Sequence, residues 1–169
     1  MTDDTALRRE IVTLIPRLRR FALGLTGSQA DADDLVQTAL EKALNRLDQF
    51  KPGTRLDSWL FRIVQTSWID NRRSAARRED TMDADMMDRI PGRQDPGHAD
   101  ALSIRDGIQR ALDQLADDQR SLAVLVLVEG YSYQEAADME GVPIGTVMSR
   151  LSRARKTMAS FLGREGLGR

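Results

Sequence analysis

The sequence lacks cysteine entirely and contains a single histidine, His98. The absence of cysteine excludes disulfides, thiolate metal sites and cysteine nucleophiles. One histidine cannot build a multi-histidine metal centre, and it leaves only one possible base for a Ser-His-Asp arrangement. Because His98 lies among proline and glycine residues, we expect it to be a solvated side chain. We therefore expect a protein that works by binding, without catalytic residues, metal or cofactor.

Long apolar runs are missing as well. The longest, residues 122–128, is far shorter than the roughly 20 residues that a helix needs to cross a bilayer. The first residues lack the basic start and apolar stretch of a signal peptide. We therefore expect a cytoplasmic protein without membrane insertion, and a chain of 169 residues has room for one ordinary domain or two small ones.

Charge is balanced in total but not in its distribution. The chain has 25 Lys and Arg against 26 Asp and Glu, for a net charge of −1. Residues 81–118 are predominantly acidic, whereas residues 143–169 are predominantly basic. A second basic cluster contains Arg72, Arg73, Arg77 and Arg78. Two basic clusters on either side of an acidic middle suit a protein that contacts a polyanion at two separate places.

The hydrophobic periodicity predicts helices throughout. Apolar residues recur at helical spacing from Leu7 to Leu25, and residues 24–28 are expected to end this helix and to cap the next with Ser28. A second helix is expected to have Asp31, Asp33 and Asp34 in or near its first turn and to bury apolar residues from Leu35 to Leu47. A Pro-Gly loop follows, and a third helix begins at about Ser58. These three helices predict an N-terminal domain at residues 1–79. Trp59 and Trp68 are expected to be core residues rather than base-stacking ones.

The rest of the chain divides into a linker and a second helical domain. Periodicity disappears over residues 80–100, which predicts a flexible acidic linker. It returns over residues 101–169, where the apolar run 122–128 is assigned to a helix because no other strand signal is present. The predicted fold is therefore all-α, with two small helical domains joined by an acidic flexible linker.

A helix-turn-helix motif lies in residues 129–155. Ser132 and Glu135 form a capping box, Gly141 suits a tight turn, and Pro143 suits the start of a second helix. That second helix is expected to bury Val147, Leu151 and Ala154 and to project polar groups able to reach bases and phosphates, namely Thr146, Ser149, Arg150, Arg153 and Lys156. The alternative is a merely solvated basic face near a helix C-terminus.

Five short blocks carry a resemblance to a known family. They are Asp31-Ala-Asp-Asp-Leu-Val-Gln37, Trp59-Leu-Phe-Arg-Ile63, Asp118-Gln-Arg120, Glu129-Gly-Tyr-Ser-Tyr-Gln-Glu-Ala-Ala137 and Gly145-Thr-Val-Met-Ser-Arg-Leu151. In this order and separation, the sequence resembles an extracytoplasmic-function (ECF) sigma factor, the smallest kind of bacterial transcription-initiation subunit. The resemblance covers nearly the whole chain. It implies an alternative sigma factor that binds core RNA polymerase and directs promoter-specific initiation.

The resemblance also implies site residues. Residues of the second helix would dock on the largest polymerase subunit, namely Asp33, Asp34, Gln37 and Thr38. The loop 50–57 would capture a flipped base of the −10 element, and the residues assigned to that element are Lys51, Arg55, Thr66, Arg72, Arg73 and Arg77. The −35 element would be read by Thr146, Met148, Ser149, Arg150, Arg153 and Lys156. For the acids of the second helix, the alternative is that they only favour a helix N-terminus. For Lys51 and Arg55, the alternative is an ordinary solvated loop charge.

The sequence departs from the family pattern at several positions. Thr66 stands where many relatives have asparagine, and Met148 stands where many have arginine, so the promoter sequence is left open. The resemblance further implies an anti-sigma factor as a partner. Two other functions compete: a sigma-like mimic that sequesters an anti-sigma factor without promoter recognition, and a dimeric helix-turn-helix repressor. The persistence of Arg150, Arg153 and Lys156 favours the sigma factor over the mimic.

Overall fold

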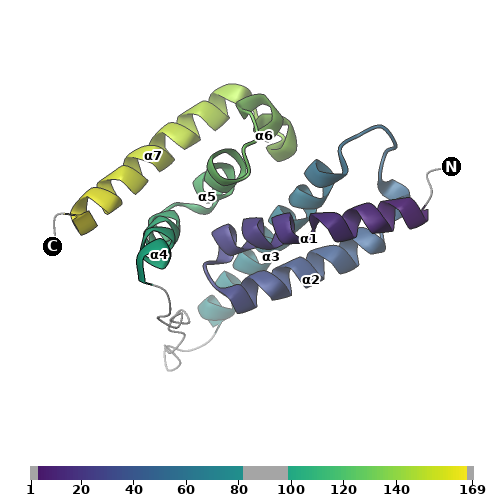
Figure 1. Cartoon of the computed structure of the whole chain (residues 1–169), viewed down its shortest axis with the longest axis horizontal. Helices are drawn as coiled ribbons and strands as arrows, with labels where there is room; N and C mark the ends of the chain where they lie inside the picture. Colours follow the sequence, from purple (N-terminus) through teal and green to yellow (C-terminus); the bar gives the residue numbers. More distant parts are fainter. Residues whose placement is uncertain (1–3, 82–98, 167–169) are drawn as a thin grey trace.

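The structure is a computed structural model that describes residues 4–81 and 99–166, the side chains of 99–103 and 165–166 excepted. Within these ranges the chain forms helices and turns and no strand. The helices fall into two groups that lie against each other, α1–α3 and α4–α7 (Figure 1). We call them the N-terminal helices and the C-terminal helices. The expected all-α fold is confirmed.

The N-terminal helices are α1 (Asp4–Thr26), α2 (Gln29–Leu44) and α3 (Leu56–Thr81), with a short 3-10 turn η1 (Leu47–Gln49) before the loop to α3. The expected cap at Ser28 is confirmed, because its hydroxyl accepts a hydrogen bond from the Asp31 backbone N–H at 3.4 Å. α3 begins at Leu56, slightly earlier than the predicted Ser58. The turn before α2 uses Gly27, whose φ of +75° favours glycine.

Gly24 does not help to end α1, contrary to the sequence prediction. It lies inside the helix and is buried, and an added Cβ would stand 2.8 and 2.9 Å from the two methyl groups of Val124. Val124 belongs to the C-terminal helices. The glycine is therefore explained by tertiary packing, since its missing side chain lets the two groups of helices approach closely.

The C-terminal helices are α4 (Ala99–Asp113), α5 (Asp117–Ala123), a π-helical turn η2 (Val124–Val128), α6 (Tyr133–Glu140) and α7 (Ile144–Gly166). The helical assignment of residues 122–128 is confirmed, because α5 passes directly into η2. Residues 82–98, which contain most of the predicted linker and His98, lie outside the described residues. The division into domains remains a proposal.

One continuous core joins the two groups of helices. The ring of Phe61 packs edge-on against Phe21 of α1 at 4.8 Å and against Tyr131 before α6 at 5.7 Å. Such aromatic pairs each contribute about 0.5–1.5 kcal/mol beyond their buried area. Trp68 is buried as predicted, while Trp59 is half-buried against Phe50. In the described ranges, no helix combines the length and apolar character that a membrane span requires.

Candidate functional site

The predicted helix-turn-helix is present in α6 and α7. The Ser132 hydroxyl accepts the Glu135 backbone N–H at 3.1 Å, and the Glu135 carboxylate accepts the Ser132 backbone N–H at 2.8 Å. This reciprocal capping box starts α6. Gly141 ends α6 in the left-handed conformation with a φ of +66°, and Pro143 immediately precedes α7. Local sequence signals therefore fix both the first helix and the turn.

α7 separates a buried face from a polar one. Val147, Leu151 and Ala154 are fully buried, as predicted. The residues proposed for DNA lie on the other face, where Met148, Ser149, Arg153 and Lys156 are exposed and Thr146 and Arg150 are half-buried. α7 runs along the outside of the molecule, away from α1 and α2 (Figure 1). This exposed face can approach a long ligand without rearrangement of α7 itself.

Arg150 differs from its neighbours on α7 because it already has an anionic partner. Its Nε lies 3.1 Å from the Asp118 carboxylate at the start of α5. Sequence reasoning missed this pair, since residues 118 and 150 are far apart in the chain. Arg153 and Lys156 form no ion pair with any described residue. The basic face of α7 thus contains both paired and unpaired cations.

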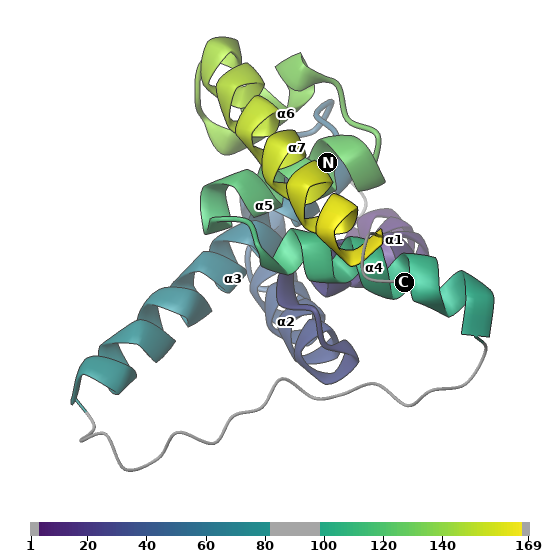
Figure 2. The same ribbon diagram turned by 90° about the vertical axis from the view of Figure 1, so that its left-hand side faces the viewer.

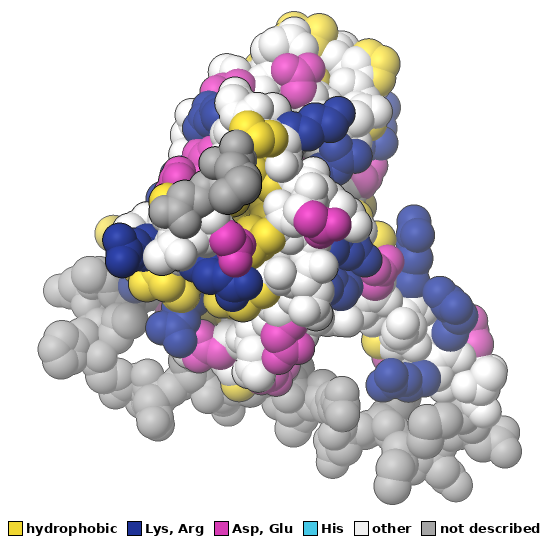
Figure 3. Space-filling view, turned by 90° about the vertical axis from the view of Figure 1, so that its right-hand side faces the viewer, with side chains coloured by type: hydrophobic (Ala, Val, Ile, Leu, Met, Phe, Trp, Pro, Cys, Tyr) yellow, Lys and Arg dark blue, Asp and Glu magenta, His cyan; other side chains and the backbone are white. Residues whose placement is uncertain are grey.

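Arg72, Arg73, Arg77 and Arg78 lie on the far half of α3, which projects from the body of the molecule (Figure 2). Figure 3 shows several Lys and Arg side chains grouped on this projecting part. Arg72, Arg73 and Arg77 are exposed, as is Thr66, whose hydroxyl donates to the Arg62 carbonyl at 2.7 Å. Arg72 is held by Asp117 of α5 at 3.1 Å.

An open cavity of about 590 Å³ lies between α3 and the C-terminal helices. Its lining includes Arg72 and Arg73 of α3 and Arg150 of α7. The structure therefore brings residues predicted for the −10 and −35 elements to the two sides of one cavity. The remaining −10 candidates, among them Lys51 and Arg77, do not line it.

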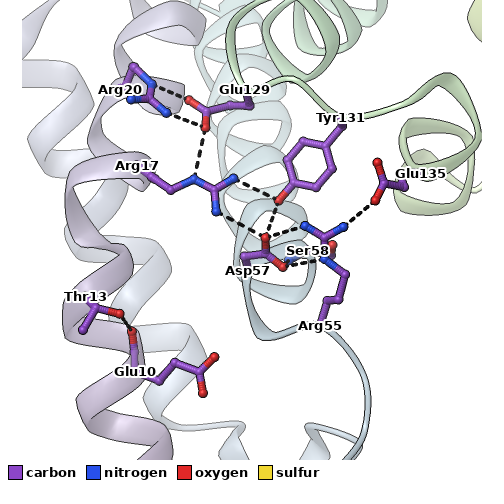
Figure 4. Close-up of polar contacts among 10 residues, drawn as sticks. All are labelled: Glu10, Thr13, Arg17, Arg20, Arg55, Asp57, Ser58, Glu129, Tyr131 and Glu135. Carbon is purple, nitrogen blue, oxygen red and sulfur yellow. Dashed lines mark hydrogen bonds and ion pairs between the residues drawn. The ribbon is translucent and has the colours of Figure 1, made fainter.

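Arg55, in the loop before α3, lies in a network of polar contacts (Figure 4). Its guanidinium donates to the Asp57 carboxylate at 2.8 and 3.1 Å, and it also pairs with Glu135 of α6. It lies 5.1 Å from the centre of the Tyr131 ring. Lys51 is exposed, and Gly53 has a φ of +84° in the turn between them. The loop therefore contains one engaged cation and one solvent-facing cation.

Asp57 is the centre of this network. Its carboxylate accepts hydrogen bonds from the Tyr131 hydroxyl at 2.9 Å and from Arg17 of α1 at 3.3 Å. Burial raises the pKa of Asp57, but the hydrogen bonds from Arg55 and Tyr131 outweigh it and hold that pKa well below its ordinary value. Asp57 therefore stays ionised at neutral pH and holds cations on both sides.

Glu129 forms the most buried ion pairs of this region. Its side chain has no exposed surface, and its two carboxylate oxygens accept hydrogen bonds from Nε and Nη2 of Arg20 at 2.8 and 2.9 Å. Arg17 adds a third contact at 3.4 Å. Such bidentate pairs are among the stronger charged interactions in proteins. Glu129 thereby connects η2 to α1.

The predicted polymerase-binding residues share one outer face of α2, because positions 33, 34, 37 and 38 are helical neighbours. Asp34 and Gln37 are exposed, and Thr38 is half-buried. Asp33 pairs with Arg19 of α1 at 3.1 Å. The described residues contain no cluster of acidic or histidine side chains suited to a metal ion.

Comparison with known proteins identifies two regions. Residues 11–65 match the model of the sigma2 domain of PhyR, and residues 105–158 match the model of sigma-70 region 4. The chain is 38% identical over 98% of its length to the ECF RNA polymerase sigma factor EcfG of Rhodopseudomonas palustris, of which it covers 89%. The chain belongs to the family of ECF sigma factors. Sigma factors of this family are transcription-initiation subunits, not enzymes.

Other relatives agree with this membership. ECF sigma factor SigM of Mycobacterium tuberculosis is 34% identical over 87% of this chain and 72% of its own length. Among solved structures, sigma factor RpoE in complex with the anti-sigma factor NepR from Bartonella quintana has a TM-score of 0.80 at 33% identity, covering 92% of this chain and 96% of that one. CnrH in complex with the cytosolic domain of CnrY has a TM-score of 0.69 at 25% identity, with 96% and 91% covered.

Sequence reasoning about this ECF sigma factor missed the carboxylates that face its arginines. Glu129 and Glu135 lie in a block that was assigned to the helix-turn-helix, and Asp117 was counted only among the acidic residues of the middle region. Their partners Arg20, Arg55 and Arg72 are between 45 and 109 positions away. No local pattern signals such a pairing.

Proposed function

We propose that this protein is an alternative sigma factor that binds core RNA polymerase and directs promoter-specific transcription initiation. The observation that carries the proposal is the exposed polar face of α7, presented by a capped helix-turn-helix beside arginine-bearing N-terminal helices. The protein acts in the cytoplasm, where its polymerase is, and it has no catalytic residue and no cofactor of its own.

The −35 element is read in duplex form by α7. The N-terminal half of α7 enters the major groove, as the second helix of a helix-turn-helix does. Arg153 and Arg150 can reach guanine edges or phosphates, and Ser149 and Thr146 can hold the backbone. Met148, which is 54% exposed on the same face, offers an apolar contact such as a thymine methyl group accepts.

The −10 element is bound by the loop before α3 and by α3 itself. Lys51 and Arg55 flank a turn that is held between two rigid helices, and Thr66 lies on the exposed side of α3. Arg72, Arg73 and Arg77 continue along the same helix and follow the DNA backbone. Positively charged tracks of this kind bind single strands through their phosphates.

The outer face of α2 docks on the polymerase. A matched pair of variants tests this assignment, because Asp34 and Asp31 are both exposed on α2. Asp34→Asn is expected to weaken binding to core polymerase by about tenfold, because a charge at the rim of an interface contributes roughly 1 kcal/mol. Asp31→Asn is expected to change this binding by less than about twofold, because Asp31 is not among the predicted polymerase-binding residues. Both variants should bind DNA as the unaltered protein does. Equal loss in both variants would assign these acids to helix capping instead.

Single-round transcription tests the function as a whole. Core polymerase from a bacterial source is incubated with and without this protein on a pool of random promoter-like templates. Protein-dependent transcripts that share two upstream elements are the expected result, and they would also give the sequence preference at Thr66 and Met148. Binding to core polymerase without transcripts would favour the sigma-like mimic, and protection of a palindromic site without polymerase would favour the repressor.

We also propose an anti-sigma factor as a partner. Support comes from the relatives RpoE and CnrH, whose structures are of complexes with NepR and CnrY. The mimic function has one point in its favour, because the N-terminal family model is named for PhyR. The PhyR–NepR structure from Bartonella quintana is 19% identical to this chain and shares the fold only. Retention of a basic α7 favours promoter binding over mimicry.

A further inference from the structure

The glycines that lie inside helices differ in their surroundings. Gly24 and Gly107 are buried, and the close approach of Val124 accounts for the first. Gly145 and Gly163 of α7 are exposed instead, and an added Cβ at either position would have no neighbour within 4 Å apart from the adjoining turn of its own helix. Neither residue has the positive φ that favours glycine. Packing and backbone conformation in the described residues therefore do not account for these two glycines.

Glycine at such positions makes a helix less stable. Apart from proline it is the residue least favourable to a helix, because it loses the most conformational freedom on folding. Alanine would fit at Gly145 and at Gly163 without a clash inside the protein. A glycine that relieves no crowding within its own chain is accounted for when another molecule comes close to the backbone at that point.

Gly145 lies in the first turn of α7, at the centre of its exposed face. At 3.6 residues per turn, position 145 falls on one line with Ser149 and Ser152, which are exposed. This line is on the side opposite the buried Val147 and Leu151. A surface that approaches α7 along this line therefore meets the helix backbone itself at position 145.

Longer side chains stand on both sides of this line, with Met148 on one side and Arg153 on the other. The major groove is about 12 Å wide, and a helix with its side chains is about 10–12 Å across, so the helix fits with little room to spare. One methyl group at the centre of the face would hold the helix away from the floor of the groove. Met148 and Arg153 would then reach the base edges less well.

Gly163 lies on the same face of α7 but far from its first turn. Positions 145 and 163 are 18 residues apart, which is about five full turns and about 27 Å along the helix axis. The end of α7 that contains Gly163 is remote from α6 (Figure 1). In helix-turn-helix proteins, the N-terminal residues of the second helix contact base edges. Gly163 is therefore a matched control for Gly145.

We propose that Gly145 is the point of closest contact between α7 and the −35 element, and that its missing side chain lets α7 enter the major groove deeply enough to distinguish bases. The proposal rests on the proposed function, because it takes α7 as the helix that reads the −35 element. It adds the residue that sets the depth of α7 and, through that depth, the reach of Met148 and Arg153. The contact is steric and requires no further charge or hydrogen bond.

The test compares Gly145→Ala with Gly163→Ala in the full chain. Each variant replaces an exposed helical glycine, so both are expected to fold and to raise the Tm by up to about 4 °C. Fluorescence anisotropy measures binding to a duplex with the −35 element found in the transcription experiment and to a duplex with the same bases in scrambled order. We expect Gly145→Ala to bind the −35 duplex about tenfold more weakly, as one mismatched base pair would, and the scrambled duplex unchanged. Gly163→Ala is expected to match the unaltered protein on both duplexes.

A larger side chain tests the steric basis of the contact. Leucine is another good helix former, and Gly145→Leu is expected to bind the −35 duplex more weakly than Gly145→Ala does. Gly163→Leu should again match the unaltered protein. A loss of affinity without a fall in Tm separates a contact with DNA from a structural role, because a structural role would lower both.

Equal affinities of Gly145→Ala and Gly163→Ala for the −35 duplex would overturn the inference. An equal loss on the scrambled duplex would overturn it too, because the contact would then be with the sugar-phosphate backbone and not with the bases. Weaker binding of Gly145→Ala to core polymerase with unchanged DNA binding would assign the contact to the polymerase instead. Each of these results leaves the proposed function intact if the unaltered protein supports transcription, whereas the absence of protein-dependent transcripts would contradict the function itself.

Discussion

The cations proposed for the −35 element differ from those proposed for the −10 element in whether a carboxylate already pairs with them. On α7, Arg153 and Lys156 are exposed and form no ion pair with any described residue. On the N-terminal helices, Arg55 and Arg72 are both exposed too, yet each is paired with a carboxylate of the C-terminal helices. Exposure alone therefore does not tell whether a cation is available to a ligand.

The difference follows from where the carboxylates are placed. Asp117 and Glu135 lie at the starts of α5 and α6, where acids favour the helix dipole. These helix starts face α3 and the preceding loop, so both acids pair with distant arginines, and Glu135 also belongs to the capping box of α6. α7 crosses the outside of the C-terminal helices, and among the described residues Arg150 is its one cation in an ion pair, with Asp118.

The largest expected effect is on the contact that joins the two regions. Gly24→Val places new methyl groups where a Cβ alone would be 2.8 Å from Val124. Overpacking of this kind costs about 1–3 kcal/mol, and we expect the upper end because the neighbour is a branched core side chain. The measurement is the free energy of unfolding.

A second helical glycine provides the control for this variant. Gly107 of α4 is also buried, but its nearest neighbour would be a flexible Leu162 methyl at 3.8 Å. Gly107→Ala is expected to stabilise the protein by up to about 1 kcal/mol, the helix propensity difference between the two residues. Destabilisation by Gly107→Ala, or a fully stable Gly24→Val variant, would contradict this explanation of the two glycines.

Much of the C-terminal region could be predicted because its signals are local. The capping box of Ser132 and Glu135, the left-handed Gly141 and the buried Val147 each depend on residues within one or two helical turns. Gly24 was misassigned to a helix end because its reason for being glycine lies in Val124, a hundred residues away. The partners of Arg55 and Arg72 were missed for the same reason. Local sequence patterns do not show which surfaces come into contact in the folded protein.

The next effect in size concerns the two arginines of α7. Arg153→Ala is expected to cost about 1–3 kcal/mol in binding to the −35 element if Arg153 is bidentate to a base. Arg150→Ala is expected to cost about half as much, because Arg150 must first leave Asp118 before it can reach DNA. Fluorescence anisotropy on a −35 duplex measures both affinities.

Asp118→Asn tests directly whether the ion pair with Asp118 limits DNA binding by Arg150. It removes the anionic partner of Arg150 without altering α7, so DNA affinity is expected to rise in this variant. Asp138→Asn is the matched control, since Asp138 is exposed and accepts a hydrogen bond only from Gln134 on its own helix. If Arg150→Ala costs as much as Arg153→Ala and Asp118→Asn changes nothing, the pairing of Arg150 with Asp118 does not limit its use.

The smallest expected effect concerns two half-buried carboxylates, Glu140 and Asp57, whose pKa values are shifted in opposite directions. Burial raises the pKa of Glu140 by more than the hydrogen bond from the Ser121 hydroxyl at 2.7 Å and the nearby charge of Arg150 lower it. A raised pKa in the folded protein means that the stability Glu140 contributes is present at low pH and is lost as pH rises through that pKa. Asp57 has the opposite sign, and its contribution is lost only as pH falls below the ordinary carboxyl range.

Glu140→Gln removes this titration and keeps an oxygen that can accept the hydrogen bond from Ser121. We therefore expect the free energy of unfolding of Glu140→Gln, relative to that of the unaltered protein, to increase as pH rises from the ordinary carboxyl range to neutral, by less than about 1 kcal/mol. Glu79→Gln serves as the control for removal of a carboxyl group, because Glu79 and Glu140 both line the cavity between α3 and the C-terminal helices. Urea unfolding at several pH values measures both. A difference for Glu140→Gln that shrinks as pH rises would contradict the sign derived from its burial between α3 and α5.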